Sequence, residues 1–320
     1  MAAALAWGQP PDLVTVRRSE NLLGVTVEVT VTAESEELGY INIEEALAEI
    51  RAVEKRISTL DPLSEASRIN AQAGIGPVAV SRELFKLLQR SVQISELTSG
   101  AFDITVGALA TIWKFDGSPT RVPARDEIAA VLPKVGYRRL QLDPENQTAF
   151  LPEAGMAIDL MGIGRGYAAD RAKEAMLYRQ VPGGMISVGG DITVWGSKAT
   201  GEKWLLGITD PVQAGHIRAW IPLIESSVSM VRPENRFIRA NGVTYGELLD
   251  PASGMPARNI EQVTVLARSA ELSHALATAL CVLGPERGIG LVEHLGDTEA
   301  IVVNTSGAVY WSRGLMLDQP

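Results

Sequence analysis

Helical and strand-like patterns follow one another in mixed runs along this chain, without a regular strand–helix–strand repeat. Period-two alternation predicts a strand or hairpin over Val14–Val31, and helical spacing predicts helices over Ile41–Ile57 and, capped by Ser81, Leu84–Leu97. The polar stretch Thr59–Ala73 is typical of a loop, and the Pro- and Gly-containing stretch 116–133 is typical of an insertion. Further strands are predicted at 140–142, 148–151, 157–160, 185–194, 204–209, 218–222, 237–240 and 263–267, further helices at 167–179, 270–281 and 286–295, and a hairpin at 300–312. This order favours an α+β fold over a doubly wound α/β fold.

Composition excludes several classes of protein. The 320 residues are 46% hydrophobic and 21% charged, so the chain can bury a sizeable core and is not of the disordered class. Lys and Arg total 29 against 38 Asp and Glu, a formal net charge of −9, and no Lys/Arg run is present, so nucleic acid is not an expected partner. Cys281 is the only cysteine, which excludes intrachain disulfides and cysteine-based zinc sites.

The N-terminus leaves the location of the protein open. No apolar run reaches the roughly 18–20 residues that a membrane-spanning helix needs, so a transmembrane protein is not expected. Residues Met1–Ala6 resemble the end of a signal-peptide apolar region, with Ala4-Leu5-Ala6 as a small-x-small cleavage site, but a basic segment and a longer apolar stretch are missing. The two interpretations are a periplasmic or exported protein and a cytoplasmic protein with a short apolar N-terminus. No cysteine follows the segment, so it encodes no lipoprotein anchor.

A glycine-rich segment is the first candidate for a binding site. Asp159-Leu-Met-Gly-Ile-Gly-Arg-Gly166 is predicted to run from a strand through a tight turn at 162–166 into a helix. Glycines let a backbone approach a ligand closely, and the free N–H groups of a first helical turn favour an anion. The alternative is a plain strand-to-helix connection. Arg165 at the helix start opposes the helix dipole unless it faces an anion, which favours a phosphate ligand.

Three further patterns carry polar groups that are ambiguous when taken alone. Val188-Gly-Gly-Asp191 places two glycines within a strand pattern, which indicates either a bulge or close approach of a ligand. His274 and Thr278 are four apart and share one helix face. Glu247 and Asp250 flank an apolar pair just before a turn, where acids are commonly solvated or cap the turn.

The order of these segments along the chain resembles the ApbE family of FAD:protein FMN transferases from about Leu23 to about Leu283. The segments that carry the resemblance are Asp61-Pro-Leu-Ser-Glu-Ala-Ser-Arg-Ile-Asn70, Ser99-Gly-Ala-Phe-Asp103, Val106-Gly107, Ile158-Asp-Leu-Met-Gly-Ile-Gly-Arg-Gly-Tyr-Ala-Ala-Asp170, Val188-Gly-Gly-Asp191, Trp204 with Asp210-Pro211, Leu249-Asp-Pro-Ala-Ser-Gly-Met-Pro256 and Ala275-Leu-Ala-Thr-Ala-Leu280.

The resemblance implies a fold and a reaction. It implies antiparallel sheets with helices around a central flavin-binding groove, with residues 1–12 as an N-terminal tail and 13–320 as one two-lobed domain. Members of this bacterial family split the FAD pyrophosphate with Mg²⁺ and attach FMN to a Thr or Ser of an acceptor flavoprotein, releasing AMP. The resemblance assigns catalysis to Arg165, Glu247 and Asp250, and a divalent metal to Gly164, His274 and Thr278. It assigns flavin binding to Gly24, Ser64, Asn70, Ala101, Phe102, Asp103, Gly107, Asp159, Gly162, Gly164, Gly189, Gly190 and Asp191.

The sequence departs from the family pattern at reactive positions. Arg165 stands where the family usually has Lys, and Met230-Val231-Arg232 replaces a Thr-Ser-Gly block. Glu247 replaces a His, and His274 replaces the Asp that binds Mg²⁺, whereas Thr278 is kept. Because Mg²⁺ prefers hard oxygen ligands, His274 favours another metal or none.

Two functions follow from these departures. The reciprocal changes at 247 and 274 suggest that a carboxylate and an imidazole have exchanged places, so that Glu247 binds metal and His274 acts as base. The first function is an FMN transferase with a reworked site. The alternative is a degenerate, flavin-binding member without transfer activity. If Arg232 blocks the flavin groove, both functions are disfavoured. If it lies along the rim, both remain open.

Overall fold

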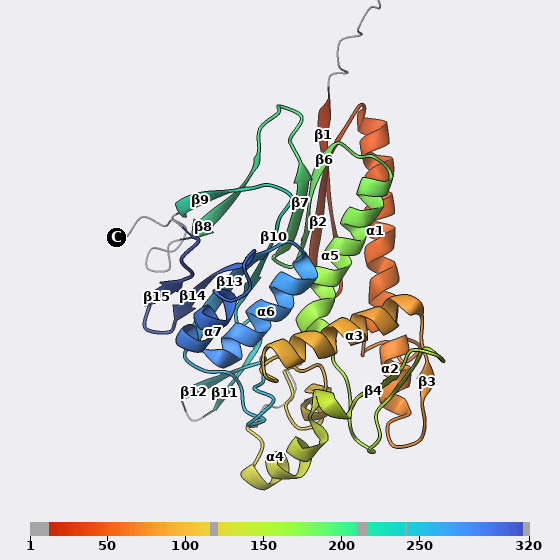
Figure 1. Cartoon of the computed structure of the whole chain (residues 1–320), viewed down its shortest axis with the longest axis vertical. Helices are drawn as coiled ribbons and strands as arrows, with labels where there is room; N and C mark the ends of the chain where they lie inside the picture. The colour runs from red at the N-terminus through yellow and green to blue at the C-terminus, as the bar shows by residue number, and fades with distance from the viewer. Residues whose placement is uncertain (1–12, 116–120, 210–216, 241, 316–320) are drawn as a thin grey trace, which may run out of the picture.

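An antiparallel sheet of eight strands forms the centre of the molecule (Figure 1). The computed structural model describes residues 13–115, 121–209, 217–240 and 242–315, so the predicted tail at 1–12 and part of the predicted insertion lie outside it. Neighbouring strands pair antiparallel throughout, in the order β1-β2-β6-β7-β10-β13-β14-β15. The strands are β1 (Val14–Leu22), β2 (Val25–Ala33), β6 (Gly183–Val188), β7 (Asp191–Gly196), β10 (Ser227–Val231), β13 (Ile260–Ala267), β14 (Glu299–Asn304) and β15 (Val309–Trp311).

Helices cover one face of this sheet. Figure 1 shows α1, α5 and α6 side by side in front of the strands, with α3 crossing near their lower ends. Val27, Val29 and Val31 alternate along β2 and are buried against these helices in the largest hydrophobic core, as the alternation predicts. The helices are α1 (Glu36–Ile57), α2 (Glu65–Ala71), α3 (Arg82–Leu97), α4 (Arg125–Val131), α5 (Met161–Tyr178), α6 (Ala270–Leu283) and α7 (Pro285–Val292).

Smaller elements complete the fold. A hairpin of β8 (Trp204–Thr209) and β9 (Ile217–Leu223) packs Trp204, Leu206 and Leu223 against Val194 and Val228 of the central sheet. The remaining strands are β3 (Val78–Ala79), β4 (Gln141–Asp143) and β5 (Thr148–Phe150) in one sheet and β11 (Phe237–Ala240) and β12 (Val243–Gly246) in another; short 3₁₀ turns span Gly107–Thr111, Leu132–Lys134 and Tyr137–Arg139. Helices and antiparallel sheets together confirm the predicted α+β class.

Serine caps fix where several helices begin. Ser81 and Ser269 accept hydrogen bonds from Leu84 and Leu272, as the sequence predicts for α3 and α6. The prediction of a loop over Thr59–Ala73 is wrong for α2, which Ser64 caps and which buries Ala66 and Ile69. Seven residues are too few to show helical periodicity in the sequence.

The described part of the predicted insertion is folded. α4 contributes Ile128 to a small apolar cluster with Leu109, Trp113 and Ile238. The indole N–H of Trp113 donates to the carbonyl of Gly254 at 2.8 Å, which ties this cluster to the turn after Asp250. The stretch is therefore anchored to the rest of the domain. The division into two lobes stays a prediction.

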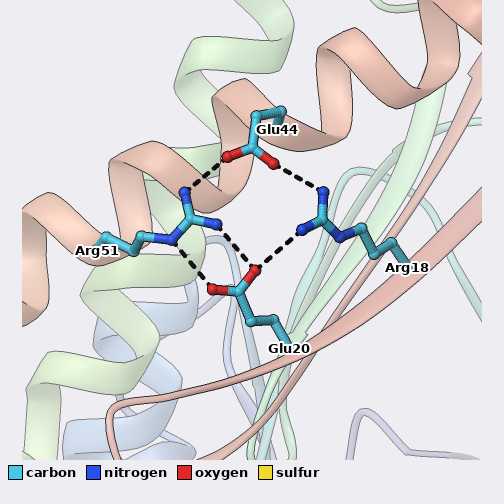
Figure 2. A network of polar contacts seen from close by, with 4 residues as sticks. All are labelled: Arg18, Glu20, Glu44 and Arg51. Atoms are coloured by element: carbon cyan, nitrogen blue, oxygen red, sulfur yellow. Dashed lines mark hydrogen bonds and ion pairs between the residues drawn. The ribbon is translucent and has the colours of Figure 1, made fainter.

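A ring of four charged side chains joins the edge strand β1 to α1 (Figure 2). Arg51 donates to Glu20 at 2.8 Å and to Glu44 at 2.8 Å, and Arg18 donates to Glu44 at 2.7 Å. Charged side chains along an edge strand also disfavour pairing with a further strand. Among the described residues, no helix combines the length and apolar character needed to cross a membrane.

Candidate active site

A groove opens at the N-terminal end of α5. Two cavities of about 200 and 270 Å³ share Val106, Asp159, Arg236, Glu247 and Leu249 and therefore form one groove, within the size range of ligand sites. Its further lining comes from several distant segments: Ala101, Phe102, Asp103, Met161, Gly162, Arg165, Gly189, Asp191, Met230, Val231, Arg232, Asn235, His274 and Thr278. Most residues predicted from the glycine-rich segment, the β6–β7 turn and α6 thus meet in one place.

A wider cavity lies elsewhere and contains none of the predicted site residues. It measures about 830 Å³ and lies between α3, α5 and the start of α6. Its charged side chains largely neutralise one another, as in the paired contacts of Arg90 with Glu271 at 2.5 and 2.8 Å. Size alone therefore does not mark the functional site.

The glycine-rich segment is helical, which corrects the predicted turn at 162–166. α5 already begins at Met161, and the expected strand before it is reduced to a single parallel bridge between Ala157 and Val106. A Cβ on Gly164 would lie 2.2 Å from Ile57 Cδ1 of α1, and one on Gly166 would lie 2.1 Å from the carbonyl oxygen of Ala270 at the start of α6. These glycines serve close packing of three helices rather than a turn.

The start of α5 presents positive charge to the groove. Asp159 accepts a hydrogen bond from the amide of Met161 at 2.8 Å, and Arg165 faces the groove one turn further along the helix. Within the described residues, the buried Nε of Arg165 has no hydrogen-bond partner. A buried guanidinium nitrogen without an acceptor, beside a helix N-terminus, is the arrangement expected of a site for an anion.

The β6–β7 connection is a two-residue hairpin turn, so neither a bulge nor one continuous strand over 185–194 is present. Val188 pairs with Asp191, and Gly189 and Gly190 have φ of +63° and +103°. Positive φ at both central residues is what this tight turn requires. The turn brings Gly189 and Asp191 to the groove.

His274 and Asp191 form a buried pair at the base of the groove. His274 Nδ1 lies 3.2 Å from Asp191 Oδ2, and the two residues are 5% and 3% exposed. Burial lowers the pKa of His274 and raises the pKa of Asp191, so the imidazole is neutral at pH 7. The amide of Gly166 also donates to His274 Nδ1, at 3.4 Å.

The predicted metal ligands do not fit Mg²⁺. His274 offers nitrogen and already faces Asp191, and Thr278 donates its hydroxyl to the carbonyl of Gly162 at 3.3 Å. Gly164 lies inside α5 against Ile57 and does not line the groove. Among the described residues, no three His, Cys, Asp or Glu side chains are grouped as a metal centre. Mg²⁺ requires several hard oxygen ligands in octahedral geometry, which this set does not supply.

The segment that departs most from the family pattern forms the rim. Arg232 is exposed and donates through Nε to Gln262 at 2.9 Å, so it lies along the rim rather than filling the groove. Arg236 donates through Nε to Glu247 at 2.6 Å. Glu247 and His274 line the same groove, but each has its own partner. The exchange of roles between them stays a prediction.

Several predicted site residues make hydrogen bonds within the protein, and the roles predicted for them stay predictions. Ser64 caps α2, and Asn70 bonds both the amide and the carbonyl of Ile158, at 2.7 and 2.9 Å. Asp103 lines the groove but accepts from Thr105 and from the amide of Tyr137. Asp250 accepts from Ala252 and Ser253 within its own turn. Gly24, in the β1–β2 turn, Gly107 and Gly190 do not line the groove.

Arg236 is a charged groove residue that the sequence did not predict. It lines both cavities and pairs with Glu247. Arg232 and Arg236 are two cations four residues apart, and such a pair can indicate an anion site. Taken singly, a basic side chain in an irregular segment is ordinarily solvated, so neither residue stands out in the sequence.

Comparisons with known proteins agree with this architecture. The family model of the ApbE family matches residues 23–302. An FAD:protein FMN transferase from Treponema pallidum is 28% identical over 315 residues, which cover 93% of this chain and 87% of that protein. The crystal structure of an ApbE protein from Thermotoga maritima superposes with a TM-score of 0.88 at 29% identity, covering 96% of this chain and all of that one. The flavin transferase ApbE from Vibrio cholerae has a TM-score of 0.82 at 26% identity, covering 94% and 98%. The chain belongs to the ApbE family.

Proposed function

We propose that this protein is an FAD:protein FMN transferase that moves FMN from FAD to a Thr or Ser hydroxyl of an acceptor flavoprotein and releases AMP. The observation that carries the proposal is the groove at the start of α5, where the buried Nε of Arg165 has no partner within the described residues. Relatives named FAD:protein FMN transferase along nearly the whole chain support the same reaction.

The reaction is attack of a hydroxyl oxygen on the phosphorus of the FMN half of FAD. A new P–O bond forms to the acceptor, the P–O bond to the AMP half breaks, and the hydroxyl proton needs a base. Arg165 neutralises the pyrophosphate charge that grows in the transition state. Glu247 is the carboxylate at the groove rim that takes the proton, with Arg236 orienting it at 2.6 Å.

Asp250 acts on this site only indirectly. Its carboxylate holds the turn that follows Leu249, through Ala252 and Ser253, and Leu249 lines the groove. It is a positioning residue for the segment that carries Glu247. No step of the reaction is assigned to a divalent metal, because the donors at His274, Thr278 and Gly164 do not suit Mg²⁺.

One observation favours a second function, a flavin-binding protein without transfer. The groove floor holds a closed His274–Asp191 pair, and the rim carries Met230, Val231 and Arg232 in place of small hydroxyl residues. These changes lie at the floor and the rim of the groove, whereas Arg165 keeps a positive charge at the start of α5. A periplasmic or exported location, which suits acceptor flavoproteins of that compartment, stays a prediction.

The two functions are separated by following both products. The full chain is incubated with FAD and a Thr-bearing acceptor domain of a covalently flavinylated protein, with and without Mg²⁺. Stoichiometric AMP, together with acceptor that gains the mass of FMN at that Thr, supports transfer. Tight FAD binding without either product supports the flavin-binding alternative. An acceptor with the Thr changed to Val is the control, because it keeps the shape and lacks the hydroxyl.

A further inference from the structure

The groove contains an arginine cluster, defined here as Arg165, Arg232 and Arg236. Arg165 comes from α5, whereas Arg232 and Arg236 come from the connection between β10 and β11. All three line the same cavity. Side chains from two separate parts of the fold therefore bring positive charge to the groove, with Arg165 at its wall and Arg232 and Arg236 at its rim.

Each member of the cluster has donors available for a ligand. Arg232 and Arg236 each use only Nε in a hydrogen bond, to Gln262 and Glu247. Within the described part of the chain their terminal Nη groups have no hydrogen-bond partner, and both residues are exposed. The buried Nε of Arg165 is likewise unpaired there. A planar guanidinium with free donors binds phosphate oxygens in a fork geometry that a point charge cannot offer.

The acidic groups of the groove are already engaged. Asp191 faces His274 at 3.2 Å, Asp159 accepts from the Met161 amide at 2.8 Å, and Glu247 accepts from Arg236 at 2.6 Å. Asp103 is buried and bonded to Thr105 and Tyr137. These contacts use one oxygen each of Asp159, Asp191 and Glu247 and both oxygens of Asp103. Among the described residues no three ligating side chains are grouped to hold a cation, whereas the Nη groups of Arg232 and Arg236 remain open.

We infer that the arginine cluster, rather than a divalent metal, holds the pyrophosphate of a dinucleotide in this groove. The inference rests on the proposed function, since it takes FAD as the ligand. A dinucleotide pyrophosphate carries two negative charges, which Arg165 from the wall and Arg232 from the rim are placed to neutralise. The charge of Arg236 is paired with Glu247, but its Nη groups remain available as hydrogen-bond donors to the phosphate oxygens. In this reworked site, arginine side chains take the place of a bound metal ion.

The test is a calorimetric FAD titration of the full chain in EDTA, in Mg²⁺ and in Mn²⁺. The expected result is one dissociation constant under all three conditions, within about twofold. Arg165→Ala is expected to weaken binding about tenfold or more, and Arg165→Lys to weaken it less, since Lys keeps the charge but loses the fork. Arg232→Gln and Arg236→Gln are expected to weaken binding as well, and because both side chains are exposed, both variants are expected to fold.

The matched control is Arg239→Gln. Arg239 lies on β11, in the same part of the chain, but stacks over Phe237 and does not line the groove, so FAD affinity is expected to stay unchanged. A tenfold gain in wild-type affinity on adding metal overturns this inference and leaves the transferase proposal standing. Unchanged affinity in all three arginine variants also overturns it. No FAD binding under any condition overturns both proposals.

Discussion

His274 and Asp191, from α6 and the start of β7, meet at 3.2 Å with their side chains buried beneath the groove. The position that the family resemblance assigns to a metal-binding carboxylate is therefore occupied by an imidazole that faces another side chain of the same chain. This contact is one reason why the donor set at this position does not suit Mg²⁺.

Replacing His274 by Asp is expected to create a response to metal. The variant places a second carboxylate beside Asp191 and near Thr278, where like charges repel unless a cation lies between them. Millimolar Mg²⁺ or Mn²⁺ should raise the melting temperature of His274→Asp and leave that of the wild type unchanged, because a ligand stabilises only the state that binds it. His274→Asn, which lacks the charge, is the control. A wild-type protein that melts higher in Mg²⁺ would contradict the expectation.

Replacing Glu247 by Gln is expected to separate catalysis from binding. The amide keeps the size of the side chain and removes the base, so transfer and AMP release should fall about 10²- to 10⁴-fold. Calorimetric FAD affinity should not fall, since Glu247 binds Arg236 rather than the ligand and its loss leaves the charge of Arg236 available to the pyrophosphate. Glu234→Gln, which changes an exposed acid of the β10–β11 connection that does not line the groove, should alter neither quantity. Equal losses in affinity and rate would show that Glu247 has a structural role only.

Gly166→Ala is expected to destabilise the whole domain. The added methyl group would lie 2.1 Å from the Ala270 carbonyl oxygen, so α5 and α6 must move apart, at a cost of about 1–3 kcal/mol or more. Urea unfolding measures the loss. Gly290→Ala in α7 is the matched control, because its Cβ meets nothing within 4 Å and should stabilise the chain by about 0.4–1 kcal/mol. Equal stability of the two variants would contradict the packing role of Gly166.

Asp170 is expected to make stability depend on pH. Its carboxylate accepts from the amides of Ala270 and Glu271 at the start of α6, and burial raises its pKa to about 6, with Glu271 adding to the shift and Lys173 opposing it. A raised folded-state pKa gives stability that is present below pH 4 and is lost as pH rises through 6.

The variant Asp170→Asn removes this titration. The wild type should lose about 1–3 kcal/mol of unfolding free energy from this group between pH 4 and pH 7, and the variant should not. Urea unfolding of both proteins across this range measures the difference. Parallel stability curves for the two proteins would show that Asp170 has no raised pKa.

Much of the fold could be predicted because its signals are local. The alternation of Val27, Val29 and Val31 and the serine caps at Ser81 and Ser269 depend on residues close in the sequence, and the structure confirms them. The role of Gly164 and Gly166 could not be predicted from residues close in the sequence. Glycines at that spacing favour a turn locally, whereas their role is set by Ile57 and Ala270, which are remote in sequence.

The candidate site was predictable only in part for a related reason. Arg165, Asp191 and His274 could be named from the segments that carry them, and the structure brings them to one groove. The pairing of His274 with Asp191, and of Glu247 with Arg236, depends on how β7, α6 and the β10–β11 connection meet. No pattern within any one of these segments indicates such partners.

The close packing of α5 has a consequence for how this protein can change over time. Gly164 and Gly166 seat the helix directly against α1 and α6, while Arg165 between them faces the ligand groove. Substitution of the residues on either side of Arg165 would therefore disturb the packing of the core. Changes in ligand specificity are therefore expected at the opposite rim of the groove, between β10 and β11. Residues there, such as Arg232, are exposed, and their substitution is expected to leave the fold intact.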